Sequence, residues 1–541
     1  MLDYRETIGI ILNKRGITEP EDIEEFLSDR PKKTYDPFLL TGMREGVDLL
    51  LSKIKSGAKI CIYGDYDADG VTASCIIATC LKRLTDNYFF YIPSRIDEGY
   101  GLNTKAIDKI KEAGTDLILT VDCGCVSYKE VEYAKALGMD VIVTDHHNIE
   151  DVMADCIVIN PKHPQNQYPC TYLAGCGVAY KLVQALQREL DLPRDVLNEA
   201  LDLAAIGTIG DIVPLLDENR TITKYGIHRC NTGSRKGLHR LAEKISLKNI
   251  NSENIAFGIV PHINAAGRMG TAMDAVRLFV TEEESEIDRL TDQLIDYNRK
   301  RKDTQETAYN TCLDYVIGDE NFILLRMDNI HEGIAGIVAG KIKDRFYRPV
   351  IIVTPSEDGR YKGTGRSIPG IDLYEVLNHC NELFIRFGGH KSACGFLMEQ
   401  ENLVKLKESI NQQATEIKEA NPEILVRKTD YDLELEPADI TVDLAKALKK
   451  LAPFGEGNPQ PKFLIGNAVM RNVNFMGKDS THARFYVSDD NHNYVNCVLF
   501  RRAQECKEIL LSGKPHDLIG SINYQIWNGQ ERVQFIIEEI I

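Results

Sequence analysis

Three short apolar segments, each followed directly by aspartate or histidine, constrain the fold of this chain more than any other feature. The segments cover 58–63, 116–121 and 140–144, and their apolar, partly β-branched residues are typical of buried strands. Helical patterns lie between them, for example at 127–138, so the order strand–helix–strand–helix–strand predicts a parallel sheet. Ligands bind beyond the carboxyl ends of the strands in such sheets, so the residues that follow the strands predict a site.

The side chains at these three strand ends carry carboxylate or imidazole groups. They are Asp65, Asp67 and Asp69 after the first strand, Asp122 after the second, and Asp145, His146 and His147 after the third. One aspartate alone would more often cap the following helix. Seven such groups at one edge of a sheet would repel one another or lack partners unless a cation joined them. The pattern therefore predicts a metal site.

The ligand types narrow the choice of metal. Carboxylates with imidazoles and without thiolates suit Mn²⁺ or Mg²⁺, and the histidines favour Mn²⁺. There are more carboxylates than one ion needs, so we expect two ions that share Asp122, on the central segment. Two ions about 3.5–4 Å apart activate a water and stabilise the leaving oxygen of a displacement at phosphorus. These residues alone predict a two-metal phosphoesterase.

The composition limits where such an enzyme works. The 541 residues suggest roughly three or four domains. No apolar run approaches the ~18 residues of a membrane span, and the charged N-terminus is unlike a signal peptide. The 14 cysteines are scattered without a C-x-x-C pair, which argues against structural zinc and a disulfide framework. We therefore expect a cytoplasmic protein with no membrane association.

The net charge of −17 argues weakly against a nucleic-acid partner. Proteins bind nucleic acid largely by neutralising phosphates with Lys and Arg. Net charge does not set the local field, however, because a basic groove can lie on an acidic body.

Several ordered motifs resemble a known family. Asp145-His146-His147 resembles the signature of the DHH phosphoesterases, and 65–70 and 122–124 resemble its other metal motifs. Further blocks at 92–102, 160–162, 173–179, 202–211 and 261–269 resemble RecJ-type single-stranded-DNA exonucleases. The resemblance adds a last metal carboxylate, and it implies this ligand set: Asp65, Asp67, Asp69, Asp122, His146 and Asp211. It also implies these catalytic residues: Asp122, His146, His147 and His390.

The later segments match the same family. Blocks at 331–339, 363–370 and 386–390 resemble the DHHA1 domain, whose Gly-Gly-His faces the metal site across a cleft. A Gly-rich turn beside Arg and Ser suits phosphate. The residues that we expect to bind phosphate are Arg95, Arg268, Arg366, Ser367, Gly389 and His390. Two positions depart from the family pattern: Tyr63 stands where many members carry His, and His262 where we expect Arg.

The end of the chain is rich in strand patterns. The block at 451–459 resembles the RecJ junction into an OB-like domain, and the turn after Trp527 predicts a hairpin. OB barrels bind single strands by aromatic stacking in a basic groove. The candidate stacking residues are Tyr486, Phe500 and Trp527, with Phe475 and Tyr524 as further candidates. Between 462 and 532 the basic residues slightly outnumber the acidic ones.

We therefore expect an α/β protein: a parallel-sheet DHH domain and a DHHA1 domain joined by a long helix, then an OB-like β-barrel. The predicted segments are a lead-in at 1–45, a DHH catalytic domain at 46–225, a helical connector at 226–318 with long helical patterns at 273–316, a DHHA1 domain at 319–425 and an OB-like nucleic-acid-binding domain at 426–541.

The resemblance implies a 5′-to-3′ exonuclease on single-stranded DNA that acts in repair or recombination. It further implies single-stranded-DNA-binding protein and a RecQ-type helicase as partners. A second hypothesis is a phosphoesterase for short oligoribonucleotides or cyclic dinucleotides, which the block at 92–102 and the β domain argue against. A third is a non-catalytic replication scaffold of the DHH fold, which the complete ligand set argues against.

Overall fold

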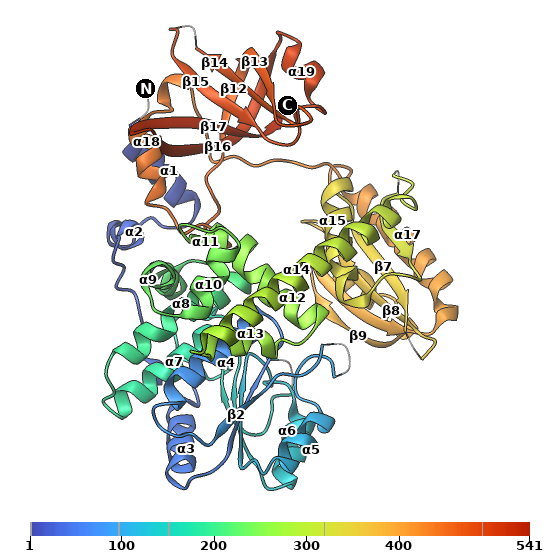
Figure 1. Ribbon diagram of the computed structural model, residues 1–541. Coiled ribbons are helices and arrows are strands. Elements are labelled where there is room, and N and C mark those ends of the chain that lie inside the picture. Colours follow the sequence, from blue (N-terminus) through green and yellow to red (C-terminus); the bar gives the residue numbers. More distant parts are fainter. Residues whose placement is uncertain (1–2, 96–97, 150–151, 319, 357, 490) are drawn as a thin grey trace.

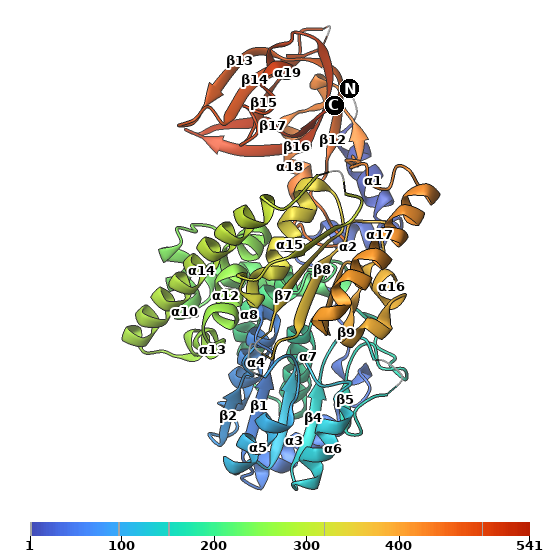
Figure 2. The same ribbon diagram turned by 90° about the vertical axis from the view of Figure 1, so that its right-hand side faces the viewer.

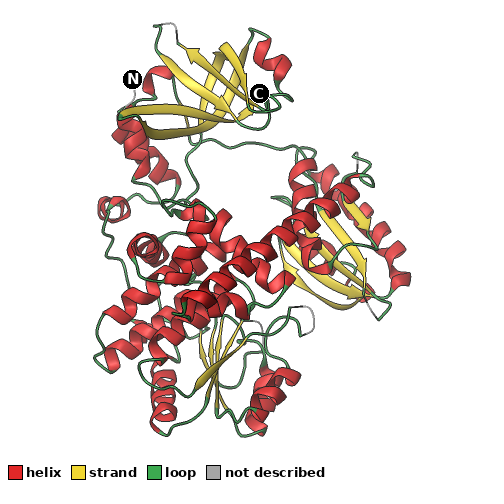
Figure 3. Ribbon diagram, in the orientation of Figure 1, coloured by secondary structure: helices red, strands yellow, loops and turns green. Residues whose placement is uncertain are grey.

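Three β-sheets with their covering helices make up the computed structural model (Figure 1). It describes residues 3–95, 98–149, 152–318, 320–356, 358–489 and 491–541, without the side chain of Trp527. Figure 3 shows the strands gathered in three separate groups, with a mainly helical region between them. Within the described ranges, no helix has the length and apolar character that crossing a membrane requires.

The first sheet has five parallel strands in the order β2-β1-β3-β4-β5 (Figure 2). The strands are β1 (Ile60–Gly64), β2 (Tyr88–Tyr91), β3 (Leu117–Val121), β4 (Asp140–Thr144) and β5 (Ile157–Ile159). The predicted parallel sheet is confirmed, and β2 and β5 add an edge strand on each side.

Helices cover both faces of this sheet, which is why its central strands are apolar throughout. Ile60 and Ile62 of β1 pack in one cluster, whereas Cys61 and Tyr63 pack in another on the opposite face. The helices of the first face are α3 (Met43–Lys55), α4 (Ala68–Leu81), α7 (Gly175–Glu189) and α8 (Asp195–Gly210). Those of the second face are α5 (Thr104–Glu112) and α6 (Tyr128–Ala136).

A helical region links the first sheet to the second. It consists of α9 (Asp217–Thr232), α10 (Lys236–Lys244), α11 (Ser252–Asn254), the π-helical turn η2 (Ile255–Ile259), α12 (Val260–Met269), α13 (Met273–Val280) and α14 (Glu284–Leu313). The helical patterns at 273–316 correspond to α13 and α14. Helix α14 contacts α10, α12 and α13 on one side and α15 (Glu332–Phe346) of the second sheet on the other.

The second sheet has the order β6-β7-β8-β10-β9, with β6 and β7 parallel and the other pairs antiparallel. Its strands are β6 (Ile323–Arg326), β7 (Val350–Pro355), β8 (Tyr361–Arg366), β9 (Phe384–His390) and β10 (Ala393–Met398). Helices α16 (Leu373–Asn378) and α17 (Leu403–Ala420) pack in the same core.

The third sheet has seven strands in the order β11-β12-β16-β17-β15-β14-β13. They are β11 (Leu433–Glu434), β12 (Phe463–Val469), β13 (Arg471–Met476), β14 (His482–Ser488), β15 (Tyr494–Leu499), β16 (Pro515–Trp527) and β17 (Gln530–Ile540). Strands β12 and β14 are not neighbours in this order but contact each other, so the sheet is curled. Two helices accompany it, α18 (Val442–Lys449) and α19 (Lys507–Leu511).

The N-terminal segment packs against this third sheet. Helix α1 (Tyr4–Lys14) contacts α18, and its Ile11 and Leu12 are fully buried in the core of the third sheet. Helix α2 (Pro20–Leu27) supplies Phe26 to the same core. The sequence indicated only a lead-in at 1–45, because a helix pattern does not reveal a partner more than 400 residues away.

A buried arginine joins three parts of the chain at this junction. Arg220 of α9 donates hydrogen bonds to the carbonyl of Phe26 and to the carbonyls of Lys450, Leu451 and Ala452. Its guanidinium also lies 3.6 Å from the centre of the Phe26 ring. These contacts fix the third-sheet domain and the N-terminal segment to the helical region.

Candidate active site

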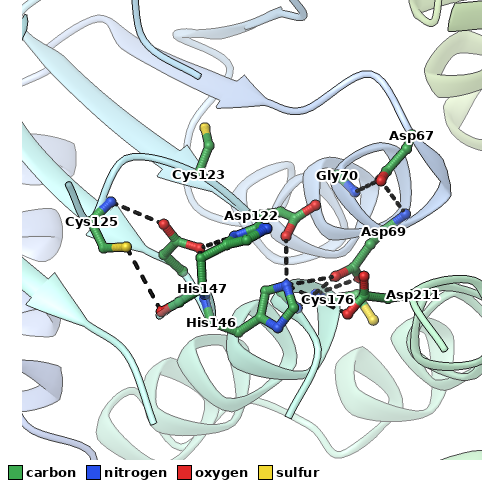
Figure 4. Close-up of polar contacts among 12 residues, drawn as sticks. Asp67, Asp69, Gly70, Asp122, Cys123, Cys125, His146, His147, Cys176 and Asp211 are labelled. Carbon is green, nitrogen blue, oxygen red and sulfur yellow. Dashed lines mark hydrogen bonds and ion pairs between the residues drawn. The ribbon is translucent and has the colours of Figure 1, made fainter. Parts of the chain in front are cut away.

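The carboxylates and imidazoles at the strand ends form one cluster (Figure 4). The Nε2 atom of His146 lies 3.2 Å from Asp122 Oδ1, 3.5 Å from Asp211 Oδ2 and 3.8 Å from Asp69 Oδ2. Three groups could each hold an ion, and they are Asp69–His146–Asp211, Asp122–His146–His147 and Asp65–Asp67–Asp122. The structure thus brings together all six metal ligands predicted from the sequence, and Asp122 belongs to two of the groups.

Local sequence explains how the first carboxylates are held. Asp67 caps helix α4, and its Oδ1 accepts the backbone N–H groups of Asp69 and Gly70. The Asp69 carboxylate accepts N–H groups of Gly175 and Cys176 at the N-terminus of α7, at 2.7 and 2.9 Å. A Cβ at position 175 would lie 2.5 Å from Asp122 Oδ1, so only glycine fits there.

Asp122 itself has a left-handed backbone, with φ of 62°. Aspartate tolerates this conformation better than most residues, but it still costs free energy. The turn directs the Asp122 side chain toward His146, whereas Cys123 points away from the cluster (Figure 4).

Several buried polar atoms of the cluster have no hydrogen-bond partner in the described part of the chain, as expected of groups that bind divalent cations. Among the described residues, Asp65 Oδ1, Asp122 Oδ1 and His146 Nε2 are buried without a hydrogen-bond partner. Burial and then the neighbouring carboxylates raise the pKa values of Asp65 and Asp122 well above the usual range, and that of Asp211 to about 8. Two divalent ions would supply the missing partners and remove the repulsion, and this oxygen-rich set with one or two imidazoles suits Mn²⁺ or Mg²⁺.

Asp145 holds His147 rather than joining a ligand group. Its buried carboxylate accepts the backbone N–H groups of His146, His147 and Cys125, and lies 2.7 Å from His147 Nδ1. Burial opposes charge on His147, but the hydrogen bond and charge of Asp145 outweigh it and raise the pKa of His147 to about 9. The hydroxyl of Tyr100 lies 3.1 Å from the same ring. The sequence placed Asp145 in the motif but did not reveal this positioning role.

We expect the stability gained from Mn²⁺ to increase with pH. Raised carboxylate pKa values mean that the metal-free folded chain binds more protons than the unfolded chain, so its stability falls as pH rises through about 8. Bound cations reverse this loss because they favour the ionised carboxylates. Thermal melts in EDTA and in Mn²⁺ measure how much Mn²⁺ raises the Tm. The rise should be larger at pH 8 than at pH 6, and Asp211→Asn should make it smaller. Equal increases at both pH values would contradict the shifted carboxylates.

Four arginines gather beside the metal cluster. Arg268 donates from Nη1 to the carbonyl of Gly333 at 2.6 Å, which ties α12 to α15. Burial and then the charges of Arg95, Arg301 and Arg366 lower the pKa of Arg268 to about 10. In the described part of the chain, Arg268, Arg301 and Arg366 form no ion pair with a carboxylate. Uncompensated guanidinium groups at such a place predict an anion site.

Arg301 is a member of this group that the sequence did not reveal. It donates from Nε to Asn298 Oδ1 at 3.0 Å and from Nη1 to Gln305 Oε1 at 2.9 Å. The amide of Asn298 contacts His262 Nε2, and His262 Nδ1 contacts the Gly258 carbonyl. His262 thus supports Arg301 through Asn298. No local pattern distinguishes Arg301 among the many charges of α14.

The other predicted residues have local contacts in their own domains. Ser367 is buried and donates its hydroxyl to the Ile371 carbonyl. Gly389 and His390 are exposed at the end of β9, and the Nδ1 atom of His390 accepts the N–H of Ser392. Tyr63 lies in the core of the opposite face and donates to the Gly101 carbonyl at 2.8 Å. The roles of Ser367, Gly389 and His390 stay predictions.

The aromatic candidates of the third sheet differ in exposure. Tyr486 forms an edge contact with Tyr494, and the exposed Phe500 forms one with His482. Tyr524 lies 4.2 Å from Lys449 Nζ. Phe475 packs partly in the core, and the side chain of Trp527 lies outside the described part of the structure.

Comparisons with known proteins match each sheet in turn. Residues 59–208 match the DHH family, N-terminal domain, residues 319–416 match the DHHA1 domain, and residues 431–539 match the RecJ OB domain. The predicted α/β architecture with DHH, DHHA1 and OB parts is therefore confirmed.

Relatives that match most of the chain agree with these family models. The single-stranded-DNA-specific exonuclease RecJ of Bacillus subtilis is 37% identical over 98% of this chain and 67% of that protein. The Escherichia coli protein of the same name is 32% identical over 83% of this chain and 81% of its own length. The crystal structure of RecJ with Mn²⁺ from Thermus thermophilus matches 99% of this chain and 76% of that chain, with a TM-score of 0.85 and 30% identity. The chain belongs to the RecJ family.

Proposed function

We propose that this protein is a metal-dependent exonuclease that hydrolyses single-stranded DNA from the 5′ end and releases 5′-mononucleotides. The observation that carries the proposal is the shared position of Asp122 in two ligand groups, beside a cluster of arginines. The relatives named as single-stranded-DNA-specific exonucleases support the same substrate. Repair and recombination are the processes that need such an activity.

Each part of the site has a role in this proposal. The residues that would hold two Mn²⁺ or Mg²⁺ ions are Asp65, Asp67, Asp69, Asp122, His146 and Asp211. When bound, two such ions lower the pKa of a water and stabilise the charge that develops on the leaving oxygen. His147, whose ring is held by Asp145 and lies beside the Tyr100 hydroxyl, is placed to donate a hydrogen bond to the phosphate. The four arginines bind the phosphates of the strand. Ser367, Gly389 and His390 contribute to the site from the domain of the second sheet.

A labelled time course tests the reaction and its direction. With Mn²⁺ and a 5′-labelled single strand, the label should appear at once as a mononucleotide. With a 3′-labelled strand, the labelled product should shorten gradually from full length. Release of the 3′ label first would contradict the proposed polarity, and no cleavage of either strand would contradict the nuclease assignment.

Arg268→Ala and Arg301→Ala should each weaken binding to all single-strand sequences alike. Each ionic interaction with a phosphate releases counterions, so the slope of log K against log salt should flatten by about 0.7 for every phosphate that the variant no longer neutralises. Arg299→Ala is the matched control, because Arg299 lies exposed on α14 and pairs with Asp296. Fluorescence anisotropy at several salt concentrations measures the slope. An unchanged slope in both variants would exclude a phosphate contact.

The two alternative functions are less consistent with the structure. A phosphoesterase for short oligoribonucleotides or cyclic dinucleotides would not need the third sheet, and a non-catalytic scaffold would not need a complete ligand set. We place the protein in the cytoplasm. We also expect a single-stranded-DNA-binding protein and a RecQ-type helicase as partners, because the proposed substrate must first be unwound.

A further inference from the structure

A groove of about 830 Å³ lies between α12 and the third-sheet domain. Arg268 and Asn264 of α12 line one end, and Lys449 and Tyr524 line the other. The side-chain oxygen of Asn264 accepts the backbone N–H of Ala68, which lies between two of the metal-ligand candidates. The groove therefore lies beside the proposed catalytic centre, and two of its lining residues, Gly210 and Ile212, flank the metal-ligand candidate Asp211.

Two large apolar side chains are exposed on the walls of this groove. Phe257 is 80% exposed and Ile212 is 69% exposed, and both line the groove. Exposed apolar surface within a groove that polar residues rim is typical of ligand-binding sites. The proposed phosphate and metal contacts use neither of them.

The backbone holds both side chains in unusual local structures. Ile212 directly follows the metal-ligand candidate Asp211 and has φ of 59°. A β-branched residue in this left-handed conformation is strained by about 1–3 kcal/mol, and such strain gathers at functional sites. Phe257 lies in the π-helical turn η2, whose Ile255 and Ile259 are fully buried, and π-turns are also frequent at functional sites.

The charges of the groove favour a single-stranded nucleic acid. Three basic and two acidic residues line the groove, although the whole chain has a net charge of −17. These residues are Arg268, Arg301, Lys449, Glu253 and Glu456. A single strand presents phosphates to basic groups and apolar base faces to Phe and Ile. A duplex keeps those base faces within its stack, so it could not make the apolar contacts.

We propose that Phe257 and Ile212 contact the unpaired bases just beyond the catalytic centre and thereby make the enzyme selective for single strands. The inference rests on the proposed function and adds two specificity-determining residues to it. The contact is with base faces of any sequence, so it limits the strandedness of the substrate and not its sequence.

A pair of substrates tests this inference on the full-length protein. One is a single strand of 12 nucleotides, and the other is the same strand with abasic sites from the second to the fifth nucleotide. Stacking on one base contributes about 1–3 kcal/mol, so Phe257→Ala should weaken binding of the normal strand at least about fivefold. The same substitution should not weaken binding of the abasic strand. The unchanged protein should bind the abasic strand more weakly than the normal strand, by a similar factor. Ile212→Ala should show the same pattern.

Tyr315→Ala and Ile317→Ala are matched controls, because both side chains are exposed but do not line the groove. Anisotropy in Ca²⁺ measures binding without relying on cleavage, and the labelled time course is run in parallel. Equal losses of affinity for the normal and abasic strands would overturn the base contact while leaving the nuclease assignment intact. If the unchanged protein cleaves neither strand, the proposed function is rejected instead. The comparison of binding to the normal and abasic strands would still test the contact with the bases.

Discussion

Asp122→Ala is expected to lower nuclease activity by several orders of magnitude while the chain still folds. Asp122 belongs to the Asp65–Asp67 group, and its Oδ1 also lies 3.2 Å from Nε2 of His146 in the Asp69–Asp211 group, so its removal disturbs both proposed ions at once. The ions act mainly on the transition state, and the loss should therefore appear in kcat rather than in KM alone. Single-turnover cleavage of a labelled strand in Mn²⁺ measures it.

Two further variants separate chemistry from folding. Asp122→Asn keeps a residue that tolerates φ of 62° and should be equally inactive, with a metal-free Tm no lower than that of the unchanged protein. This follows because the variant removes a buried carboxylate that repels its neighbours. Asp140→Asn, at the opposite end of β4 and exposed, should keep full activity. Substantial activity in both Asp122 variants would disprove the two-metal assignment.

The metal centre could be predicted from the sequence because its signals are local. Each central strand is a short apolar run, and Asp67, Asp122 and His146 follow these runs within a few residues. The carboxyl ends of parallel strands meet at one edge, so sequence position alone indicated proximity. The edge strand β2 was missed because its Tyr88–Tyr91 run is aromatic and only half-buried.

Other features depended on tertiary contacts that no local pattern reveals. Arg301 is one charged residue among many on α14, and only its contact with Asn298 and its proximity to Arg268 distinguish it. Helix α1 has an ordinary apolar face, but its partner α18 lies more than 400 residues away. His390 and Ser367 were predicted by resemblance to a motif, and the hydrogen bonds that they form in this structure are local ones.

Removal of the third-sheet domain is expected to raise the apparent KM for long single strands at least about tenfold and to shorten processive runs. Each base stacked on an aromatic contributes about 1–3 kcal/mol in any sequence, which suits a domain that grips the strand. Its surface carries the exposed aromatic residues Phe500 and Tyr494, and the exposed cations Arg471 and Arg484 lie on its strands β13 and β14. Turnover of very short oligonucleotides should change far less, because the proposed catalytic groups all lie in the first two domains.

The contacts of the third-sheet domain with α1 and Arg220 determine how the truncated variant must be designed. Ending the chain near residue 425 would expose Ile11 and Leu12 of α1, which are buried against the third sheet. It would also remove three of the carbonyl groups that satisfy the buried Arg220. The deletion of 426–541 should therefore be combined with deletion of 1–19 and with Arg220→Met, and a cooperative thermal melt should show that the remainder folds.

A variant of the intact chain makes the same test independent of that deletion. Tyr486→Ala combined with Tyr494→Ala removes an aromatic pair on neighbouring strands β14 and β15 without opening the core. If the domain grips the strand, this variant should raise the apparent KM for long strands and leave dinucleotide turnover unchanged. If both the deletion and the double substitution digest long strands as well as the unchanged protein does, the domain must serve a protein partner, because a surface that binds no strand has no other role in the proposed reaction.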